Sequence, residues 1–160
     1  MERAGKKAAA VVAAVLVALA AGCGGGGGSS RLSKSEYEQK LKAEGSHLKS
    51  AFSASGIEQS SNVDELMARL TSLQKELDQS ASDLEELNPP KDAEADNAKF
   101  ADALHKAADK FGELKVAAKA KDQQRVQQLT QEVGTVLQEG QAASDDLKAK
   151  GYDIGILGQG

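Results

Sequence analysis

Cysteine, proline and aromatic residues are scarce in this chain, and each scarcity limits what the protein can be. Cys23 is the single cysteine, so no disulfide can form within the chain, and packing must stabilise the fold. Tryptophan is absent, and only two tyrosines and three phenylalanines are present, which argues against a sugar-binding surface built from exposed rings. The two prolines are adjacent, at Pro89 and Pro90, and mark one firm break between helices.

Strongly basic, nucleotide-binding and catalytic sequence features are absent as well. The net charge of −4 argues against nucleic acid as a partner and against electrostatic adhesion to anionic lipid. The sequence contains no G-x-S-x-G, no G-x-x-x-x-G-K-[ST] and no C-x-x-C-H motif. We therefore expect a protein that is not an enzyme, with no catalytic residue and no cofactor.

The N-terminal residues up to Cys23 have the order of an export signal. Arg3, Lys6 and Lys7 form a positive start, and residues 8–21 form an apolar run that ends in small residues. Such a run makes a helix of about 21 Å, which is short for the ~30 Å hydrocarbon core of a membrane. We therefore predict a cleaved signal rather than a membrane span.

This segment resembles the signal peptide of bacterial lipoproteins, in which the cysteine receives lipid and becomes the first mature residue. The resemblance covers residues 1–23, with Ala20 where the commonest lipobox has leucine and with Leu19 one residue earlier. It implies that residues 1–22 are removed and that acyl chains such as palmitate on Cys23 anchor the protein at the extracytoplasmic face of the cell membrane. The alternatives are an ordinary cleaved secretory signal and an uncleaved anchor.

Beyond the signal, the sequence predicts three parts. Residues 23–32 comprise the lipidated Cys23 and a tether of glycine and serine, in which glycine has no side chain to bury. Residues 33–151 form a helical bundle domain, and residues 152–160 form a tail that either lies over the end of the bundle or stays loose. Removal of residues 1–22 takes away two net positive charges, which changes the net charge from −4 to −6.

Residues 33–151 contain the start and stop signals of four helices. Ser33 and Glu36 form a capping box at the start of a first helix that runs to about residue 53. Asn62 caps a second helix, which ends before the prolines, and a third begins near residue 92. Asp122 caps a fourth helix, and Gly151 ends it in the manner of a Schellman motif.

Apolar residues recur along each predicted helix at spacings of three and four, as in amphipathic helices. The stripes are Tyr37, Leu41, Leu48 and Phe52; Leu66, Leu70, Leu73, Leu77, Ala81, Leu84 and Leu87; Phe100, Leu104, Ala107, Phe111, Leu114 and Ala118; and Val126, Leu129, Val133, Val136, Gly140, Ala143 and Leu147. They predict an all-α, up-down four-helix bundle with a first helix of about 20 residues and three longer ones of about 26 to 29. Gly140 and Gly134 would let the fourth helix approach a neighbour closely. The second stripe would also suit an intermolecular coiled coil.

Candidate binding residues are few. Glu44 and His47 have the E-x-x-H spacing that di-iron bundles use, and Asp102 and His105 have a similar spacing on the third helix. The apolar stripe of that helix turns Asp102 and His105 outward, so we expect surface histidines and no metal site. Asn97 extends the same stripe toward the helix start, where we expect it to be solvated; the alternative is a buried asparagine that fixes register.

These features together predict a lipid-anchored, non-catalytic interaction or scaffold module at the cell envelope. Its partners would be membrane lipid, through acylation of Cys23, and an envelope protein bound by an exposed helix face. In its architecture and its helix break at Pro89 and Pro90, the mature chain resembles the small helical lipoproteins of unknown function that many bacteria carry. The alternative is a bundle that binds a small ligand or a metal at the membrane surface, which requires Glu44, Asn97 and a histidine to converge inside.

Overall fold

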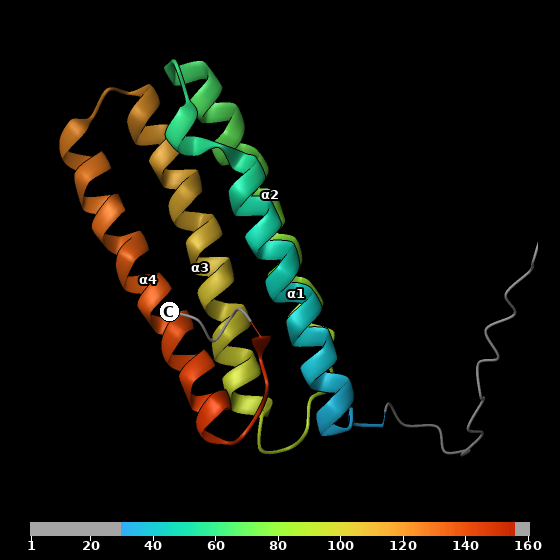
Figure 1. The fold of residues 1–160 in the computed structure, drawn as a ribbon. Helices are drawn as coiled ribbons and strands as arrows, with labels where there is room; N and C mark the ends of the chain where they lie inside the picture. The colour runs from blue at the N-terminus through green and yellow to red at the C-terminus, as the bar shows by residue number, and fades with distance from the viewer. Residues whose placement is uncertain (1–29, 156–160) are drawn as a thin grey trace, which may run out of the picture.

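The computed structural model describes residues 30–155, and this part of the chain consists of helices and connections without a strand (Figure 1). The helices are α1 (Lys34–Ser55), α2 (Val63–Glu85), α3 (Glu94–Lys119) and α4 (Gln123–Ala149), with a short 3-10 helix, η1 (Ile57–Gln59), between α1 and α2. The predicted all-α bundle is therefore confirmed. Helix α2 has 23 residues, fewer than expected and only slightly more than the 22 of α1. The predicted signal, Cys23 and the glycines of the predicted tether lie outside the described residues, as do residues 156–160.

Side chains cap α1, α2 and α4 where the sequence predicts them. The Ser33 hydroxyl accepts a hydrogen bond from the Glu36 amide, and the Glu36 carboxylate accepts one from the Ser33 amide at 2.8 Å, which completes the capping box. Asn62 Oδ1 accepts from an amide in the first turn of α2 at 2.9 Å. Asp122 Oδ1 does the same for α4 at 3.0 Å. Each acceptor satisfies an amide that the helix itself leaves unpaired.

The end of α4 forms the predicted Schellman motif. Gly151 has a φ of 81°, a left-handed conformation that glycine adopts readily. The Tyr152 amide donates to the Leu147 carbonyl at 3.0 Å, and the Gly151 amide donates to the Lys148 carbonyl at 2.8 Å. This turn sends the chain back over the bundle, where Tyr152 and Ile154 are buried. The tail was expected either to lie over the end of the bundle or to stay loose, and its described residues lie over the bundle.

Helix α3 occupies the middle of the bundle, with α2 packed on one side and α4 on the other. Helix α1 packs against α2, and within residues 30–155 no Cα atom of α1 lies within 8 Å of one in α4. Figure 1 shows the result, with α1 and α4 on opposite sides of α3. The bundle is thus open between its first and last helices.

Leucine and alanine side chains form most of the core. The leucines with at most 2% of their surface exposed are Leu41, Leu70, Leu73, Leu77, Leu84, Leu129 and Leu147. Helix α3 adds the buried alanines Ala101, Ala103, Ala107, Ala108 and Ala117. These small side chains bury less apolar area than leucine, but they let the two neighbouring helices come close to α3.

Glycine permits a close approach of α4 to α3 at one position. Gly140 is buried, and a Cβ at this position would lie 3.5 Å from the Cβ of Ala103 and 3.8 Å from the ring of Phe100. The expected close approach is therefore confirmed at Gly140. It is wrong at Gly134, where, apart from the backbone of α4 itself, no atom of the described residues lies within 4 Å of the position of a Cβ.

Phe52 is predicted on the inner face of the first helix, but 41% of its surface is exposed. Tyr37, Leu41 and Leu48, the earlier members of the same stripe, are buried. The difference arises because α1 packs against α2 and not against α4, so its last turn has no helix over the side on which Phe52 lies.

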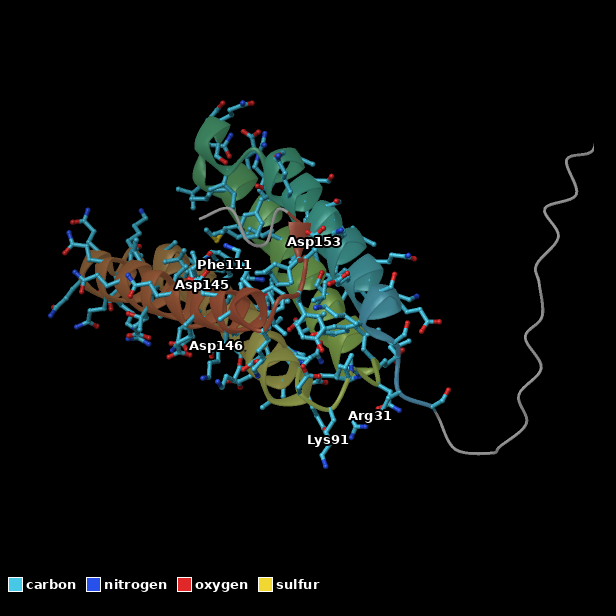
Figure 2. All side chains as sticks on the ribbon, turned by 60° about the horizontal axis from the view of Figure 1, so that its bottom comes forward. Arg31, Lys91, Phe111, Asp145, Asp146 and Asp153 are labelled. Carbon is cyan, nitrogen blue, oxygen red and sulfur yellow. The ribbon has the colours of Figure 1, made fainter. Side chains whose placement is uncertain are left out.

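The bundle has two distinct ends. The proximal end comprises the start of α1, the loop between α2 and α3, and the end of α4 with its tail. The distal end comprises the two remaining connections, residues 56–62 and residues 120–122. Figure 2 shows that Arg31 and Lys91 lie together beside the α2–α3 loop at the proximal end.

The chain is fastened to the α2–α3 loop immediately before α1 begins. The Leu32 amide donates to the Asn88 carbonyl at 2.7 Å. The Arg31 guanidinium donates to the Pro89 carbonyl at 3.0 Å and pairs with Glu94 at 2.9 Å. These contacts join segments that lie about sixty residues apart in the sequence.

Candidate functional site

The residue predicted to carry lipid, Cys23, lies outside the described residues. The described part of the chain begins at Ser30, next to the proximal end. Among residues 30–155, no helix combines the length and the hydrophobicity that crossing a membrane requires.

Glu44 and His47, which have the spacing of a metal-binding pair, lie where α1 faces α2. The two ring nitrogens of His47 point toward different carboxylates: Nδ1 lies 3.6 Å from Glu44 Oε1, and Nε2 lies 3.1 Å from Glu76 Oε2. The Ser80 hydroxyl lies 3.5 Å from Nδ1. Because a histidine binds a metal ion through one nitrogen, an ion beside one of these carboxylates would not reach the other. The ring instead bridges α1 and α2.

His105 repeats this arrangement between α3 and α2. Its Nδ1 lies 3.3 Å from Asp78 Oδ1, and its Nε2 lies 3.6 Å from Glu85 Oε1. Asp102, the other half of the predicted pair, is exposed and pairs with Lys106 at 2.8 Å. Among residues 30–155, no group of three or more histidine, cysteine, aspartate and glutamate side chains is arranged to hold a metal ion.

Asn97 is 5% exposed, so the expectation that it is solvated is wrong. The Tyr37 hydroxyl donates to Asn97 Oδ1 at 3.0 Å, and Asn97 Nδ2 donates to the Leu84 carbonyl at 2.8 Å. The residue is covered because Tyr37 of α1 and the last turn of α2 both close over the start of α3. Burial raises the pKa of Tyr37. Asn97 thereby ties three helices together, as in the register-fixing alternative.

A polar cluster that the sequence analysis missed surrounds Asp96 at the proximal end. The Asp96 side chain is 3% exposed and accepts hydrogen bonds from Lys150, at the end of α4, and from Lys99, at 3.3 Å. Burial opposes the ionisation of Asp96, but the two lysines outweigh it and lower the pKa of the carboxyl. The spacing of Asp96 and Lys99 on one helix is a local signal, whereas the contact with Lys150 depends on the folded arrangement.

Tyr152 joins the tail to the same end of the bundle. Its hydroxyl donates to Asp92 Oδ1 at 2.8 Å. Its ring meets the Tyr37 ring edge-on, with the two centroids 5.6 Å apart and the planes at 88°. Burial and the bond to Asp92 raise the pKa of Tyr152 to about 12. The polar side chains of the proximal end are thus bonded to one another.

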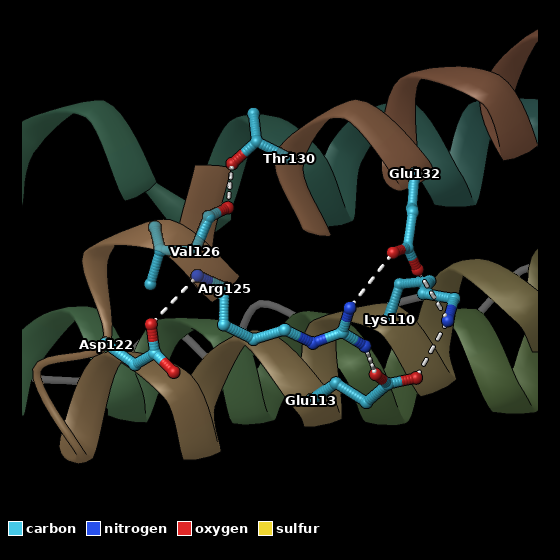
Figure 3. Close-up of polar contacts among 7 residues, drawn as sticks. All are labelled: Lys110, Glu113, Asp122, Arg125, Val126, Thr130 and Glu132. Atoms are coloured by element: carbon cyan, nitrogen blue, oxygen red, sulfur yellow. Dashed lines mark hydrogen bonds and ion pairs between the residues drawn. The ribbon is translucent and has the colours of Figure 1, made fainter. Parts of the chain in front are cut away.

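Four charged side chains form a ring between α3 and α4 toward the distal end (Figure 3). Lys110 pairs with Glu113 and with Glu132, each at 2.8 Å. Arg125 pairs with Glu132 at 3.1 Å and also with Glu113. Hydrogen bonds from Lys110 and Arg125 lower the pKa of both glutamates. Because these side chains are partly exposed, the ring is a brace at the surface between two helices.

The residues that a ligand- or metal-binding bundle would need do not converge. Glu44 and His47 lie in the middle of α1 and face α2, while Asn97 lies at the proximal end, where Tyr37 and Leu84 use its polar atoms. No protein-family model matches the chain, and none of the curated proteins or solved structures compared with it is similar. The functional argument therefore rests on the sequence and on the surface of the bundle.

Proposed function

We propose that the protein is a lipid-anchored, non-catalytic interaction module on the extracytoplasmic face of the cell membrane. The observation that carries the proposal is the order of the N-terminal sequence: a positive start, a short apolar run, Cys23, and then glycines and serines up to residue 30. Acyl chains on Cys23 would anchor the protein. Residues 24–32 would join this anchor to the bundle.

The geometry of the proximal end is consistent with this arrangement. The chain enters the bundle at the Ser33 cap, so an anchor that precedes it is attached at one end of the helices. Helix α1 has 22 residues and is therefore about 33 Å long. The distal end, where Phe52 is 41% and Val63 is 55% exposed, would lie roughly that far from the attachment point.

The pairing of polar groups favours binding at the surface over binding in the interior. The buried polar residues each have a hydrogen-bond partner within the fold: Ser80, Asp96, Asn97 and Ser144. Among the described carboxylates without a lysine or arginine partner, Asp83 and Glu86 are exposed near the end of α2. A partner that approaches from outside can reach these groups.

The anchor is tested by Cys23→Ser, which removes the thiol that would receive lipid. We expect most of the protein to move from the membrane fraction to the soluble fraction, because no acyl chain would hold it. Cell fractionation followed by immunoblotting measures the distribution. Ser29→Ala is the control, since it alters the neighbouring sequence but leaves the thiol in place.

Equal membrane association of the Cys23→Ser and Ser29→Ala proteins would contradict the anchor. Mass spectrometry of the N-terminal peptide provides a second readout. We expect it to begin at an acylated Cys23, whereas an unmodified N-terminus would indicate an ordinary secretory signal.

The interaction role is tested by chemical cross-linking of the anchored protein in intact cells. We expect a reproducible partner from the cell envelope to be captured. If nothing is captured above the background of untreated cells, the interaction module is wrong even where the anchor is right.

A further inference from the structure

Two hollows lie along the contact between α1 and α2. The first, of about 380 Å³, lies between Lys40 and Ala43 of α1 and the end of α2 with the turn that follows it. The second, of about 290 Å³, lies between Ala51 and Ala54 of α1 and the middle of α2. We call the surface that contains both hollows the α1–α2 seam. Neither α3 nor α4 contributes a residue to it.

The floor of the seam is apolar. Leu84 lines the first hollow and Leu73 lines the second, and each is 1% exposed. Ala43 and Ala54 lie at the exposed rim and are too small to fill the hollows. Because the two leucines are almost fully covered, the apolar surface open to an incoming side chain is mainly that of the alanines, and its alkyl part would displace water there, which is favourable.

Carboxylates dominate the rim of the seam. Glu44, Asp83 and Glu86 border the first hollow, and Glu76 borders the second, against one lysine, Lys40. Within the described part of the chain, the ion pairs of these four carboxylates are those of Glu44 and Glu76 with His47, and none involves a lysine or arginine. The seam therefore carries negative charge over an apolar floor.

The carboxylates of α4 differ from those of the seam in their ion pairs. Each of them pairs with a lysine or an arginine: Glu132, Glu139, Asp145 and Asp146. The carboxylates of the seam therefore differ from those of α4 in having no lysine or arginine partner among the described residues.

Glu44 is the least exposed of the four carboxylates of the seam. Its side chain is 14% exposed, and its Oε1 atom is buried without a hydrogen bond. The His47 Nδ1 atom, with which it forms an ion pair if the ring is protonated, is 3.6 Å away, beyond normal hydrogen-bond distance. A hydrogen bond from a cationic group to a buried carboxylate oxygen is favourable, because burial without a donor costs free energy.

We propose that the α1–α2 seam binds a basic segment of a partner protein, with one lysine or arginine side chain in each hollow. The alkyl stems would lie over Leu84 and Leu73, and the charged groups would reach the carboxylates of the rim. Ala43 and Ala51, which border different hollows, are separated by about 12 Å along α1, close to two turns of a helix. This separation favours a peptide segment over a small cation, which would fill one hollow and leave the other empty.

The inference rests on the proposed function, because it names the surface through which the module binds. To test it, a photoreactive amino acid replaces Ala43 or, separately, Ala54 in the full chain in its own cells. Gln138, exposed on α4, is the control position. We expect both seam positions to capture the same partner through a peptide with at least two lysines or arginines, and Gln138 to capture far less.

Neutralised variants test the role of charge. Asp83→Asn with Glu86→Gln removes two exposed carboxylates without altering the core, and we expect capture at Ala43 to fall about tenfold or more. Glu44→Gln should have the same effect. Asp145→Asn with Glu139→Gln is the matched control on α4 and should leave capture unchanged.

Several outcomes would overturn the proposal. These are a captured peptide without basic residues, a peptide of this chain itself, equal capture from the neutralised variants, and no capture at either seam position. Capture at Gln138 alone would overturn the seam while leaving the interaction module intact. Loss of membrane association, in contrast, would count against the anchor of the proposed function and not against the seam.

Discussion

Asp96 is a buried carboxylate in the first turn of α3, and its ionised form is held by Lys99 and Lys150. Lys150 also donates to the Asp92 carbonyl at 2.7 Å, so the end of α4 is joined to the start of α3. Because the pKa of Asp96 is lower in the folded protein, the ionised carboxylate stabilises the proximal end.

We expect Asp96→Asn to lower the free energy of unfolding at neutral pH by about 1–2 kcal/mol, because a charged hydrogen-bond acceptor is lost. A carboxyl with a lowered folded-state pKa stabilises the fold above its unfolded pKa of about 3.9. That stabilisation is lost as the pH falls through the folded-state pKa. The difference between the two proteins should therefore be full at neutral pH and shrink below about pH 4. Urea unfolding at a series of pH values measures it.

Asp145→Asn is the control for this comparison. The Asp145 side chain is 58% exposed and pairs with Lys148 on the same helix, so its loss should change stability little at any pH. If the deficit of Asp96→Asn stays constant as the solution is acidified, the charge of Asp96 does not stabilise the fold.

Single residues could be predicted from the sequence where their partner is a near neighbour. Ser33, Asn62 and Asp122 bond to amides three residues later, so four residues of sequence are enough to identify each cap. Asn97 could not be predicted in this way, because its partner Tyr37 lies 60 residues away. The Glu44 and His47 pair was found from its spacing, but only the fold shows that Glu76 takes the other ring nitrogen.

At the scale of helices, α3 and α4 are joined by two different kinds of contact. In the half of α4 nearer the proximal end, the absence of a side chain at Gly140 lets the helix lie against Ala103 and Phe100. Farther along, the ring of charges that includes Lys110 and Arg125 links the exposed sides of the same two helices. The packing at Gly140 depends on the absence of a side chain, whereas the ring of ion pairs depends on long side chains.

Gly140→Leu is expected to lower the free energy of unfolding by about 1–3 kcal/mol, because a leucine side chain must displace Ala103 and Phe100. Gly134→Leu is the matched control on the same helix. Within residues 30–155, no atom other than the backbone of α4 itself lies within 4 Å of its added Cβ, so the variant should be neutral or slightly stabilising through its better helix propensity. Thermal unfolding followed by circular dichroism compares them. Equal stability of the two variants would show that α4 does not depend on close contact at Gly140.

The existence of the helices could be predicted because a spacing of three and four follows directly from helix geometry. The length of α2 was overestimated for a related reason. Leu87 continues its apolar stripe but lies beyond the end of the helix, where it packs partly buried against the core. An apolar pattern reports contact with the core and does not report where the helix ends.

At the scale of the whole molecule, the tail supplies a contact between the first and last helices. Asp153 pairs with Lys42 of α1 at 2.5 Å, and its amide donates to the Glu38 carboxylate at 3.0 Å. Ile154 is 2% exposed. In Figure 2, Asp153 lies on the segment that runs from the end of α4 toward α1. The tail thus closes one end of an otherwise open arrangement.

Ile154→Asp is expected to lower the free energy of unfolding by about 2–4 kcal/mol, because a charge replaces a buried apolar group. Hydrogen exchange should increase most in the first half of α1, which loses its link to the end of α4. Leu137→Asp is the matched control, since Leu137 is 50% exposed and the change should have little effect. Exchange that rises equally in α1 and α2 would contradict a local role of the tail.

Whether the first and last helices contact each other was the least predictable feature of the packing. An apolar stripe shows that a face is buried but does not identify the element that buries it. Phe52 continues the apolar stripe of α1, yet among residues 30–155 no Cα atom of α1 lies within 8 Å of one in α4, and Phe52 is left 41% exposed. The α1–α2 seam depends on the same arrangement, since its hollows are formed by side chains of two helices that no spacing along one helix relates.

The fastening of the chain before α1 has a mechanical consequence. A pull on the chain ahead of Arg31 is resisted first by the contacts of Arg31 and Leu32 with the α2–α3 loop, and only then by the first turn of α1. A force directed away from the proximal end runs along the axis of α1. The packed faces of α1 and α2 must then slide past each other as a whole, because no single pair of residues bears the load alone. Drag on the bundle would therefore be shared by many contacts at once.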